Sequence, residues 1–474
     1  MSSAVSPDLS PELRNRFAKF RGHDGCPSRS VSLLLSQSPS GAASAEQASS
    51  ARLTELFDRK DYVAALKAVA ARPDETLSLY VRIPFCAGRC LYCGCNTTIT
   101  HDSARLDRYL DALDQEMSMV AERIGATRDV LQVQLAGGTP NYLNDAQLTR
   151  LTEMMERHFR ILPDTDQSIE CDPRRTSAGQ LELLHALGFR RITFGVQDLD
   201  PVVQRAIGRL QSPDLIRDVY WLAREIGFES IGLELIYGLP QQTDQTFGRT
   251  LDSVLELSPD RVTCFGYARN TSAGSHQHAI DVHQLPSERL RQALFEQAVQ
   301  TFSGSGYSWI GLDTFALDTD ELSLAQDEKR LHRNCIGYTA NPSDHMLGFG
   351  SGAIGEVNSN CVQNDCSLED WEAMLERGEF PVIRGYHVSA DERRRRDAIA
   401  HMICNLELPA ALAAGCLDDE YARLASYAAD GLVEVGATGL KITSSGRHLL
   451  RSLCSEHAAF FNWDHARWDS ARTN

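Results

Sequence analysis

The chain reads Tyr80-Val-Arg-Ile-Pro-Phe-Cys-Ala-Gly-Arg-Cys-Leu-Tyr-Cys-Gly-Cys-Asn96 directly after an apolar run. This stretch places Cys86, Cys90 and Cys93 on one short loop, with three and then two residues between them. Three thiolates with this spacing can hold three irons of a 4Fe–4S cube and leave the fourth iron open to a chelating cofactor. The stretch therefore predicts an iron–sulfur site with one free coordination position, with Cys86, Cys90 and Cys93 as the metal ligands.

Clustered cysteines have two other uses that stay open at this point, a structural zinc site and a disulfide knot. Structural zinc usually draws on two ligand pairs with a longer spacer, and no second Cys or His pair is evident in the sequence. Disulfides need an oxidising compartment, and the N-terminal stretch shows no signal-peptide pattern. Cys95 has a spacing that does not suit the same cube, so we interpret it as a nearby non-ligand.

Composition favours a soluble enzyme. The formal net charge of −17 argues against a nucleic-acid partner, which requires concentrated positive charge. No apolar run approaches the length of a bilayer span. The chain has thirteen cysteines, and those outside the loop are scattered, as expected of free thiols in a reducing compartment. We therefore expect a cytoplasmic monomer that binds neither nucleic acid nor membrane.

Three parts are visible along the chain. Residues 1–52 are rich in Ser and Ala with little periodicity, which predicts a flexible N-terminal arm. From 53 to 366, β-rich runs alternate with amphipathic helical stretches. The predicted strands are 77–83, 131–135, 168–171, 191–196, 230–236, 261–265 and 309–313. Predicted helices include 103–123, 145–157, 214–226 and 287–302. This alternation predicts an α/β fold with a parallel sheet, which we interpret as a partial (open) α/β barrel with its chemistry at the carboxyl ends of the strands.

Residues 367–474 have a different character. Helical patterns at 391–405 and 418–429 precede two alternating runs around 436–439, which predict a hairpin. A last helix is predicted from Gly446. This part is expected to be a mainly helical, winged-helix-like C-terminal cap domain.

Longer motifs carry a family resemblance. They are Ile83-Pro84-Phe85-Cys86, Cys93-Gly94-Cys95-Asn96, Gly137-Gly138-Thr139-Pro140, Gly195-Val196-Gln197-Asp198, Ile236-Tyr237-Gly238-Leu239-Pro240 and Leu331-His332-Arg333-Asn334. From about residue 80 to about 450 the chain resembles the oxygen-independent coproporphyrinogen III oxidases (coproporphyrinogen dehydrogenases), a branch of the radical S-adenosyl-L-methionine (SAM) enzymes. The resemblance implies a 4Fe–4S cluster, two SAM molecules, a small-molecule substrate such as a tetrapyrrole or another aromatic compound, and an external electron donor such as flavodoxin or ferredoxin.

The resemblance also implies cofactor contacts. For the cluster-bound SAM these are Tyr80 at the end of the first strand, Gly137 in the turn after the second strand, and Glu170. For the second SAM the matching positions are Tyr92, Gly138, Thr139, Gln197, Arg209, Glu234, Ala268 and Ile354. A guanidinium at Arg209 suits a cofactor carboxylate through its two-pronged donor geometry. Without the resemblance, the glycines are also consistent with ordinary tight turns, and Ala268 and Ile354 with plain core.

Some positions depart from the family pattern. Glu234 stands where the family has aspartate, and Thr314 replaces a histidine in the Asp-His-Phe-Ala pattern. The family's N-terminal Arg-Tyr-Thr-Ser-Tyr-Pro-Thr segment retains little beyond Pro27. Two activities are therefore considered, with no catalytic residue assigned for either. The first is radical oxidative decarboxylation of coproporphyrinogen III to protoporphyrinogen IX, as part of haem biosynthesis. The second is radical C-methylation or cyclopropane formation on an aromatic natural product. A haem-binding relative without turnover is the non-enzymatic alternative.

Overall fold

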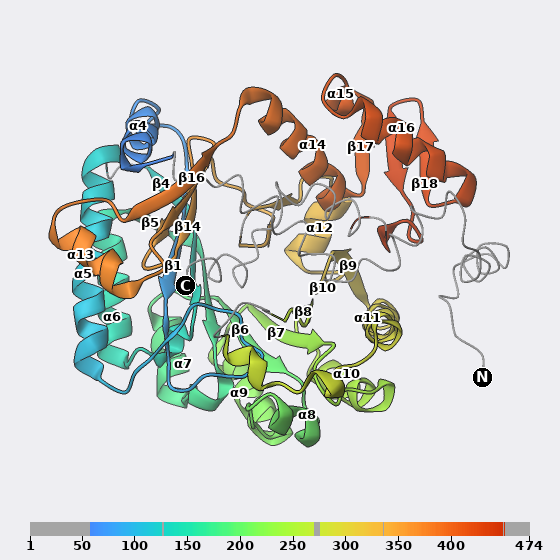
Figure 1. Cartoon of the computed structure of the whole chain (residues 1–474), viewed down its shortest axis with the longest axis horizontal. Coiled ribbons are helices and arrows are strands. Elements are labelled where there is room, and N and C mark those ends of the chain that lie inside the picture. Colours follow the sequence, from blue (N-terminus) through green and yellow to red (C-terminus); the bar gives the residue numbers. More distant parts are fainter. Residues whose placement is uncertain (1–56, 126–127, 270–274, 335, 449, 451–474) are drawn as a thin grey trace. The chain divides into compact units, whose positions relative to one another are not determined.

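The computed structural model describes residues 57–125, 128–269, 275–334, 336–448 and 450 of the chain (Figure 1). Their contacts divide them into two compact units. The larger unit contains the described residues of 57–285 and 341–388, and the smaller unit those of 286–340 and 389–450. The flexible arm predicted for 1–52 lies outside the described residues. The domain boundaries at 52/53 and 366/367 stay a prediction.

A parallel sheet with helical connections forms the centre of the larger unit (Figure 1). Its strands pair in chain order: β1 (Leu77–Ile83), β4 (Asp129–Gly137), β5 (Arg160–Cys171), β6 (Arg191–Gln197), β7 (Ser230–Tyr237) and β8 (Arg261–Gly266). The helices between them are α5 (Ser103–Ile124), α6 (Asp145–His158), α7 (Ala178–Ala186), α8 (Pro201–Ala206), α9 (Pro213–Ile226) and α10 (Asp244–Leu257). The strand order is linear, so the predicted open α/β barrel is confirmed.

The chain returns to the other side of β1 and widens the sheet. Strand β13 (His345–Phe349) pairs parallel with β1, and a meander of antiparallel strands follows it. These strands are β14 (Ile354–Val357), β15 (Asn360–Asn364) and β16 (Val382–His387). Other elements of this unit are α4 (Arg59–Ala70), β2 (Phe85–Cys86), β3 (Thr98–Ile99), α13 (Leu368–Glu376) and the 3-10 turns η2 (Pro140–Tyr142), η3 (Pro173–Arg175), η4 (His276–Ala279) and η5 (Val282–Gln284).

Strand β1 lies in the interior of the sheet. All seven of its residues are buried, because strands lie on both of its edges and the sheet is covered. Helix α5 buries one apolar face, which includes Leu106, Leu113 and Val120. The helix begins where the Asp102 side chain accepts a hydrogen bond from the Ala104 N–H, and it ends at Gly125, whose φ is 81°.

The smaller unit joins two segments of the chain. The first contains α11 (Glu288–Ser303), β9 (Tyr307–Gly311), β10 (Thr314–Leu317), α12 (Glu321–Asp327), β11 (His332–Arg333) and β12 (Tyr338–Thr339). The second contains α14 (Ala390–Asn405), β17 (Glu407–Pro409), α15 (Ala410–Ala413), α16 (Asp418–Ser426), η6 (Tyr427–Asp430), β18 (Val433–Gly436) and β19 (Gly439–Ile442). Gln326 Nε2 ties the segments together, because it donates to the carbonyls of Ile310 and Cys404 at 2.6 and 2.7 Å. The predicted hairpin is present as β18 and β19.

Several predicted elements differ in detail. The strand expected at 309–313 is a hairpin of β9 and antiparallel β10, with Leu312 at a φ of 39° in the turn. Strand β5 begins at Arg160 rather than near 168. Tyr80 is the central residue of β1, so its placement at the end of that strand was wrong. The helix predicted from Gly446 extends mostly outside the described residues. None of the helices in the described part of the chain is long and apolar enough to cross a membrane.

Candidate active site

The cysteine loop leaves the carboxyl end of β1 and is closed at its base. Strand β2 carries Cys86 and pairs with β3, so that Phe85 is opposite Thr98 and Cys86 opposite Ile99. The Thr98 N–H also donates to the carbonyl of Pro84 at 2.7 Å. These contacts make residues 86–97 a short closed loop on the carboxyl edge of the sheet.

The three thiols influence one another. Burial raises the pKa of Cys86 to about 11, although a hydrogen bond with Thr139 opposes the rise and the neighbouring Cys93 and Cys90 add to it. The pKa of Cys93 falls to about 7, chiefly because Cys95 hydrogen-bonds to its sulfur. The Cys95 N–H lies 3.4 Å from that sulfur. Cys95 therefore supports the thiolate of Cys93.

The donor set suits a cubane cluster. Within the described residues, no three His, Cys, Asp or Glu side chains converge closely enough to hold one metal ion. Each cysteine of a 4Fe–4S site binds a different iron, so its sulfurs need not meet at one point. Three thiols on one closed loop therefore fit a cluster with one iron left open.

A buried arginine that the sequence interpretation missed fastens this loop. Arg82, on β1, donates from Nη2 to the carbonyl of Asn96 and from Nη1 to the carbonyl of Ser351, both at 2.8 Å. Asn96 is held further by its own donation to the carbonyl of Cys366 at 2.6 Å. A charged residue in an otherwise uncharged, buried strand was the signal available in the sequence.

The glycine pair at the carboxyl end of β4 lies against the same loop, with Gly137 as the last residue of the strand rather than in the turn after it. Gly137 has a φ of 116°, which favours glycine, and a Cβ there would lie 2.6 Å from Cγ of Arg82. A Cβ on Gly138 would lie 2.9 Å from the carbonyl oxygen of Phe85. Thr139 then places its hydroxyl 3.2 Å from the sulfur of Cys86. The motif thus brings backbone close to the cysteine loop.

Glu170, near the end of β5, is half-buried beside this motif. Burial raises the pKa of Glu170 to about 8, and the charge of Glu234 adds to the rise. Hydrogen bonds from the Gly137 N–H and the Gln134 side chain oppose it. Gly137 and Glu170, predicted to share one cofactor, are therefore in contact.

A second group gathers at the carboxyl ends of β6 and β7. A Cβ on Gly195 would lie 2.8 Å from Nε2 of Gln197, 3.3 Å from Nη2 of Arg209 and 3.8 Å from Oε2 of Glu234. Burial raises the pKa of Glu234, while Arg209 and a hydrogen bond from Gln197 oppose the rise. Gln197 has a φ of 67°, at the point where the β6–β7 register shifts. These three predicted second-SAM residues are brought together.

Arg209 is held in place while one of its donors stays free. Its Nη2 donates to the carbonyl of Gly195 at 2.7 Å, and its Nη1 pairs with Oδ2 of Asp172 at 3.2 Å. Its Nε is buried and has no hydrogen-bond partner among the described residues. A ligand carboxylate is the natural acceptor for such a donor.

Asp172 and Arg174 were not predicted as site residues. Burial favours a higher pKa for Asp172, but its hydrogen bonds with Arg174 and the charge of Arg209 hold that pKa below the usual range. Nη2 of Arg174 and Nη1 of Arg209 lie 3.8 and 3.7 Å from the sulfur of Cys90. Two guanidinium groups therefore face this thiol. The Asp-Pro-Arg-Arg sequence directly after β5 was the available signal.

The remaining predicted residues lie around these groups. Tyr92 and Ala268 are linked by Gln277, whose Nε2 donates to their carbonyls at 2.6 and 3.3 Å. Burial raises the pKa of Tyr92, although Arg209 lies close enough to lower it. Ile354 is buried on β14, which in the strand order is separated from β6 by β13, β1, β4 and β5. The remaining departure, Thr314, is on β10 in the smaller unit.

Comparison with known proteins identifies the class to which this chain belongs. The Radical SAM superfamily profile matches residues 80–254, which include the cysteine loop, Glu170 and Arg209. The fold and the three-cysteine loop thus define a radical SAM enzyme, a class that uses a 4Fe–4S cluster and SAM.

Two curated relatives are similar over most of their length. The oxygen-independent coproporphyrinogen III oxidase of Escherichia coli is 40% identical over 399 residues, which cover 82% of this chain and 87% of the relative. That of Pseudomonas aeruginosa is 38% identical over 392 residues, covering 80% and 84%. A solved structure of the E. coli coproporphyrinogen III oxidase, described as a radical SAM enzyme, superposes with a TM-score of 0.80 at 38% identity and covers 87% of this chain and 95% of its own. The chain belongs to the oxygen-independent coproporphyrinogen III oxidase family of radical SAM enzymes.

Proposed function

We propose that this chain oxidises coproporphyrinogen III, removing carbon dioxide from two propionate side chains to give protoporphyrinogen IX. The observation that carries the proposal is its 40% identity over 87% of a relative named for that substrate. In each round the propionate would lose one hydrogen atom, one electron and carbon dioxide, leaving a vinyl group. An external acceptor would take the electron, and an external donor would reduce the cluster. The chain would act as a monomer.

Cys86, Cys90 and Cys93 would hold the cluster. When bound, the cluster and SAM would supply the radical chemistry that removes a hydrogen atom from the substrate. Arg82 would keep the loop closed through its bonds to Asn96 and Ser351. Cys95 would keep the Cys93 sulfur ionised, since its hydrogen bond lowers the pKa of that thiol.

Two SAM molecules would share the carboxyl edge of the sheet. SAM carries two positive groups and one carboxylate. Glu170 and Glu234 are half-buried with raised pKa values, so a cationic ligand would favour their ionised forms. The free Nε of Arg209 supports a carboxylate ligand beside Gln197 and Glu234. We assign Tyr80, Gly137 and Glu170 to the first SAM. The second would contact Tyr92, Gly138, Thr139, Gln197, Arg209, Glu234, Ala268 and Ile354.

Carbon transfer is the second candidate, and Glu234 is the observation that favours it. The longer side chain hydrogen-bonds with Gln197 beside Arg209, so the second cofactor would sit differently than over an aspartate. A radical methyl transferase or cyclopropane-forming enzyme would use that cofactor as a carbon source. Thr314 stands where the family has histidine, and this second departure also allows a substrate other than coproporphyrinogen III.

One labelling experiment separates the two functions. The reconstituted protein is incubated anaerobically with reductant, coproporphyrinogen III and SAM carrying carbon-13 in its methyl group. Protoporphyrinogen IX without label, formed with loss of carbon dioxide, would support the proposal. Labelled carbon in a product would support the second candidate. Intact coproporphyrinogen III alongside cleaved SAM would contradict the proposed substrate.

A further inference from the structure

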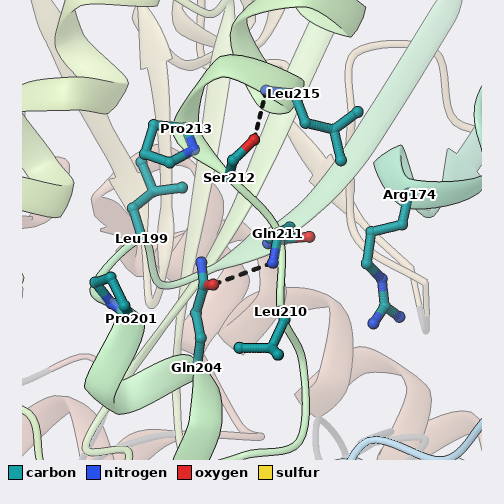
Figure 2. Close-up of a pocket in the computed structure, with 9 residues that line it drawn as sticks. All are labelled: Arg174, Leu199, Pro201, Gln204, Leu210, Gln211, Ser212, Pro213 and Leu215. Atoms are coloured by element: carbon teal, nitrogen blue, oxygen red, sulfur yellow. Dashed lines mark hydrogen bonds between the residues drawn. The ribbon is translucent and has the colours of Figure 1, made fainter.

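An open apolar pocket lies on the larger unit beside the cysteine loop. A depression of about 560 Å³ lies between the turn after β5 and the connection from β6 to α9. Figure 2 shows the side chains that line it. Leu210, in its lining, has 61% of its surface exposed, more than any other large apolar side chain in the described chain. The other apolar lining residues are Leu199, Pro201, Pro213 and Leu215. Leu210 thus offers a partner an exposed apolar side chain beside an apolar depression.

The pocket has a firm frame. The Gln211 N–H donates to Oε1 of Gln204 at 3.1 Å, and the Leu215 N–H donates to the hydroxyl of Ser212 at 3.1 Å (Figure 2). Gln204 and Gln211 are themselves buried. A partner would therefore meet a surface that is already formed.

This pocket is one side chain away from a proposed cluster ligand. Arg174 lines the pocket and lies 3.8 Å from the sulfur of Cys90. Leu210 directly follows Arg209, which lies 3.7 Å from the same sulfur. The Leu91 N–H also donates to the carbonyl of Ile207 at 2.9 Å. This bond joins the cysteine loop to the segment between α8 and α9, which carries Leu210. A molecule seated here would lie close to Cys90.

The charge of the pocket contrasts with that of the chain. Among its lining residues Arg174 is a cation and none is an anion, whereas the chain has a net charge of −17. Arg205 is exposed one helical turn from Pro201. The amino end of α9 at Pro213 adds partial positive charge.

Three nearby carboxylates, Asp172, Asp200 and Asp214, are paired with arginines. Asp172 pairs with Arg174 at 2.6 Å and with Arg209 at 3.2 Å. The other two pairs are Asp200 with Arg249 at 3.0 Å and Asp214 with Arg217 at 2.7 Å. An acidic partner would be repelled by most of this chain and attracted here, which would orient its approach.

The geometry points to this pocket as the docking surface for an acidic one-electron carrier protein that reduces the cluster. The inference rests on the proposed function, because it assigns the partner of the same site. In the step, the carrier is oxidised by one electron and the cluster is reduced by one, and no atoms are exchanged. Apolar contact at Leu210 would hold the carrier, and Arg174 with the end of α9 would supply the complementary charge.

The test compares a protein reductant with a small one. Leu210→Glu and Leu210→Gln are reconstituted, and cluster reduction is followed by stopped-flow absorbance with flavodoxin hydroquinone or with dithionite. Leu324→Glu, an exposed leucine on α12 that does not line the pocket, is the matched control. Leu210→Glu should slow reduction by flavodoxin about tenfold or more, and Leu210→Gln less, because the glutamate also adds a repulsive charge. Reduction by dithionite and iron content should not change.

Several results would overturn the inference. Equal flavodoxin rates for Leu210→Glu and Leu324→Glu would do so, as would failure of flavodoxin to reduce the unmodified protein when dithionite succeeds. Loss of a dimer in Leu210→Glu without a change in flavodoxin rate would mean that a second copy of the chain covers the pocket. If no cluster forms at all, the proposed function fails instead. Calorimetric binding of flavodoxin to the unmodified chain and to Leu210→Glu then still decides whether the pocket binds the carrier.

Discussion

Arg82 on β1 donates a hydrogen bond from Nη2 to the carbonyl of Asn96, the last residue of the cysteine stretch, over 2.8 Å. The strand that starts the loop thus also holds its far end. The same guanidinium donates to the carbonyl of Ser351, which follows β13. One buried side chain therefore links the cysteine loop to the segment after β13. Cluster binding should therefore depend on a residue that touches no iron.

Arg82→Lys tests this dependence. Lysine keeps the charge but cannot reproduce the two-pronged donation, so one carbonyl loses its charged donor at a cost of about 2 kcal/mol. We expect iron and sulfide content after reconstitution to fall by roughly half or more. Arg224→Lys is the matched control, because Arg224 on α9 donates to the hydroxyl of Tyr220 and pairs with Asp260, residues outside the cysteine loop. Equal iron content in the two variants would contradict the anchoring role.

Gly138→Ala should disturb the loop by contact rather than by conformation. Its Cβ would lie 2.9 Å from backbone atoms of both Pro84 and Phe85, which cannot move without shifting the loop. We expect destabilisation of about 1–3 kcal/mol, seen as a lower thermal midpoint and a lower iron content. Gly88→Ala is the control from the same loop, since its Cβ would meet no atom within 4 Å. A normal midpoint and iron content for Gly138→Ala would show that the loop has more room than this contact implies.

The cluster ligands can be tested one by one. Cys86→Ala, Cys90→Ala and Cys93→Ala should each lose the cluster, because each thiol would hold a different iron. Cys95→Ala should retain it, since Cys95 acts on the Cys93 sulfur by hydrogen bonding. Anaerobic iron and sulfide analysis after reconstitution measures the result. A full cluster in Cys90→Ala would rule out the ligand assignment.

The parallel strands could be predicted because their apolar runs are nearly continuous. Strand β5 was predicted too short, since residues 160–167 contain polar side chains without a strand pattern. That part is held by pairing with β4 and by the Thr165 hydroxyl, which donates to the carbonyl of Val130. The hairpin of β9 and β10 was missed because its turn at Leu312 lacks the Gly or Asn that usually signals one.

The site was predictable where a motif carried it. The cysteine loop and the Gly137–Thr139 motif follow directly from local sequence. Asp172 and Arg174 were missed because their role appears only when the end of β5 meets Arg209 and Cys90 in space. Glu116 was missed as well, because a glutamate within an amphipathic helix ordinarily faces solvent.

Glu116 predicts a pH dependence of stability. It is buried on α5 and accepts hydrogen bonds from the Gly350 N–H and from Asn364 at 2.8 and 2.6 Å. Burial raises its pKa from 4.5 to about 7, which these bonds oppose. The folded state therefore holds this proton more tightly than the unfolded state. The resulting stabilisation is complete below about pH 4.5 and is lost as the pH rises through about 7.

Glu116→Gln should remove that dependence. Glutamine stays neutral, so the variant should gain stability relative to the unmodified protein by up to about 3 kcal/mol between pH 4.5 and 7.5. Urea unfolding at several pH values measures the difference. Glu153→Gln, at an exposed position on α6, is the control. A constant difference for Glu116→Gln would contradict the assignment.

Arg209→Lys tests the second SAM. The variant keeps a positive charge beside Asp172 but loses the two-pronged fork and the free Nε. Loss of a charged, buried hydrogen bond weakens binding by about 2–3 kcal/mol, or roughly a hundredfold. Equilibrium dialysis should therefore give two SAM per unmodified chain and one per variant. Reductive cleavage of the first SAM should persist, because Gly137 and Glu170 are unchanged.

The control is Arg191→Lys, at the start of β6 where Arg191 pairs with Asp166, and this variant should behave as the unmodified protein. Iron analysis must accompany the measurement, since Arg209 also faces Cys90. One SAM per chain in the unmodified protein, with a full cluster, would remove the second cofactor from the proposal and leave the first site intact.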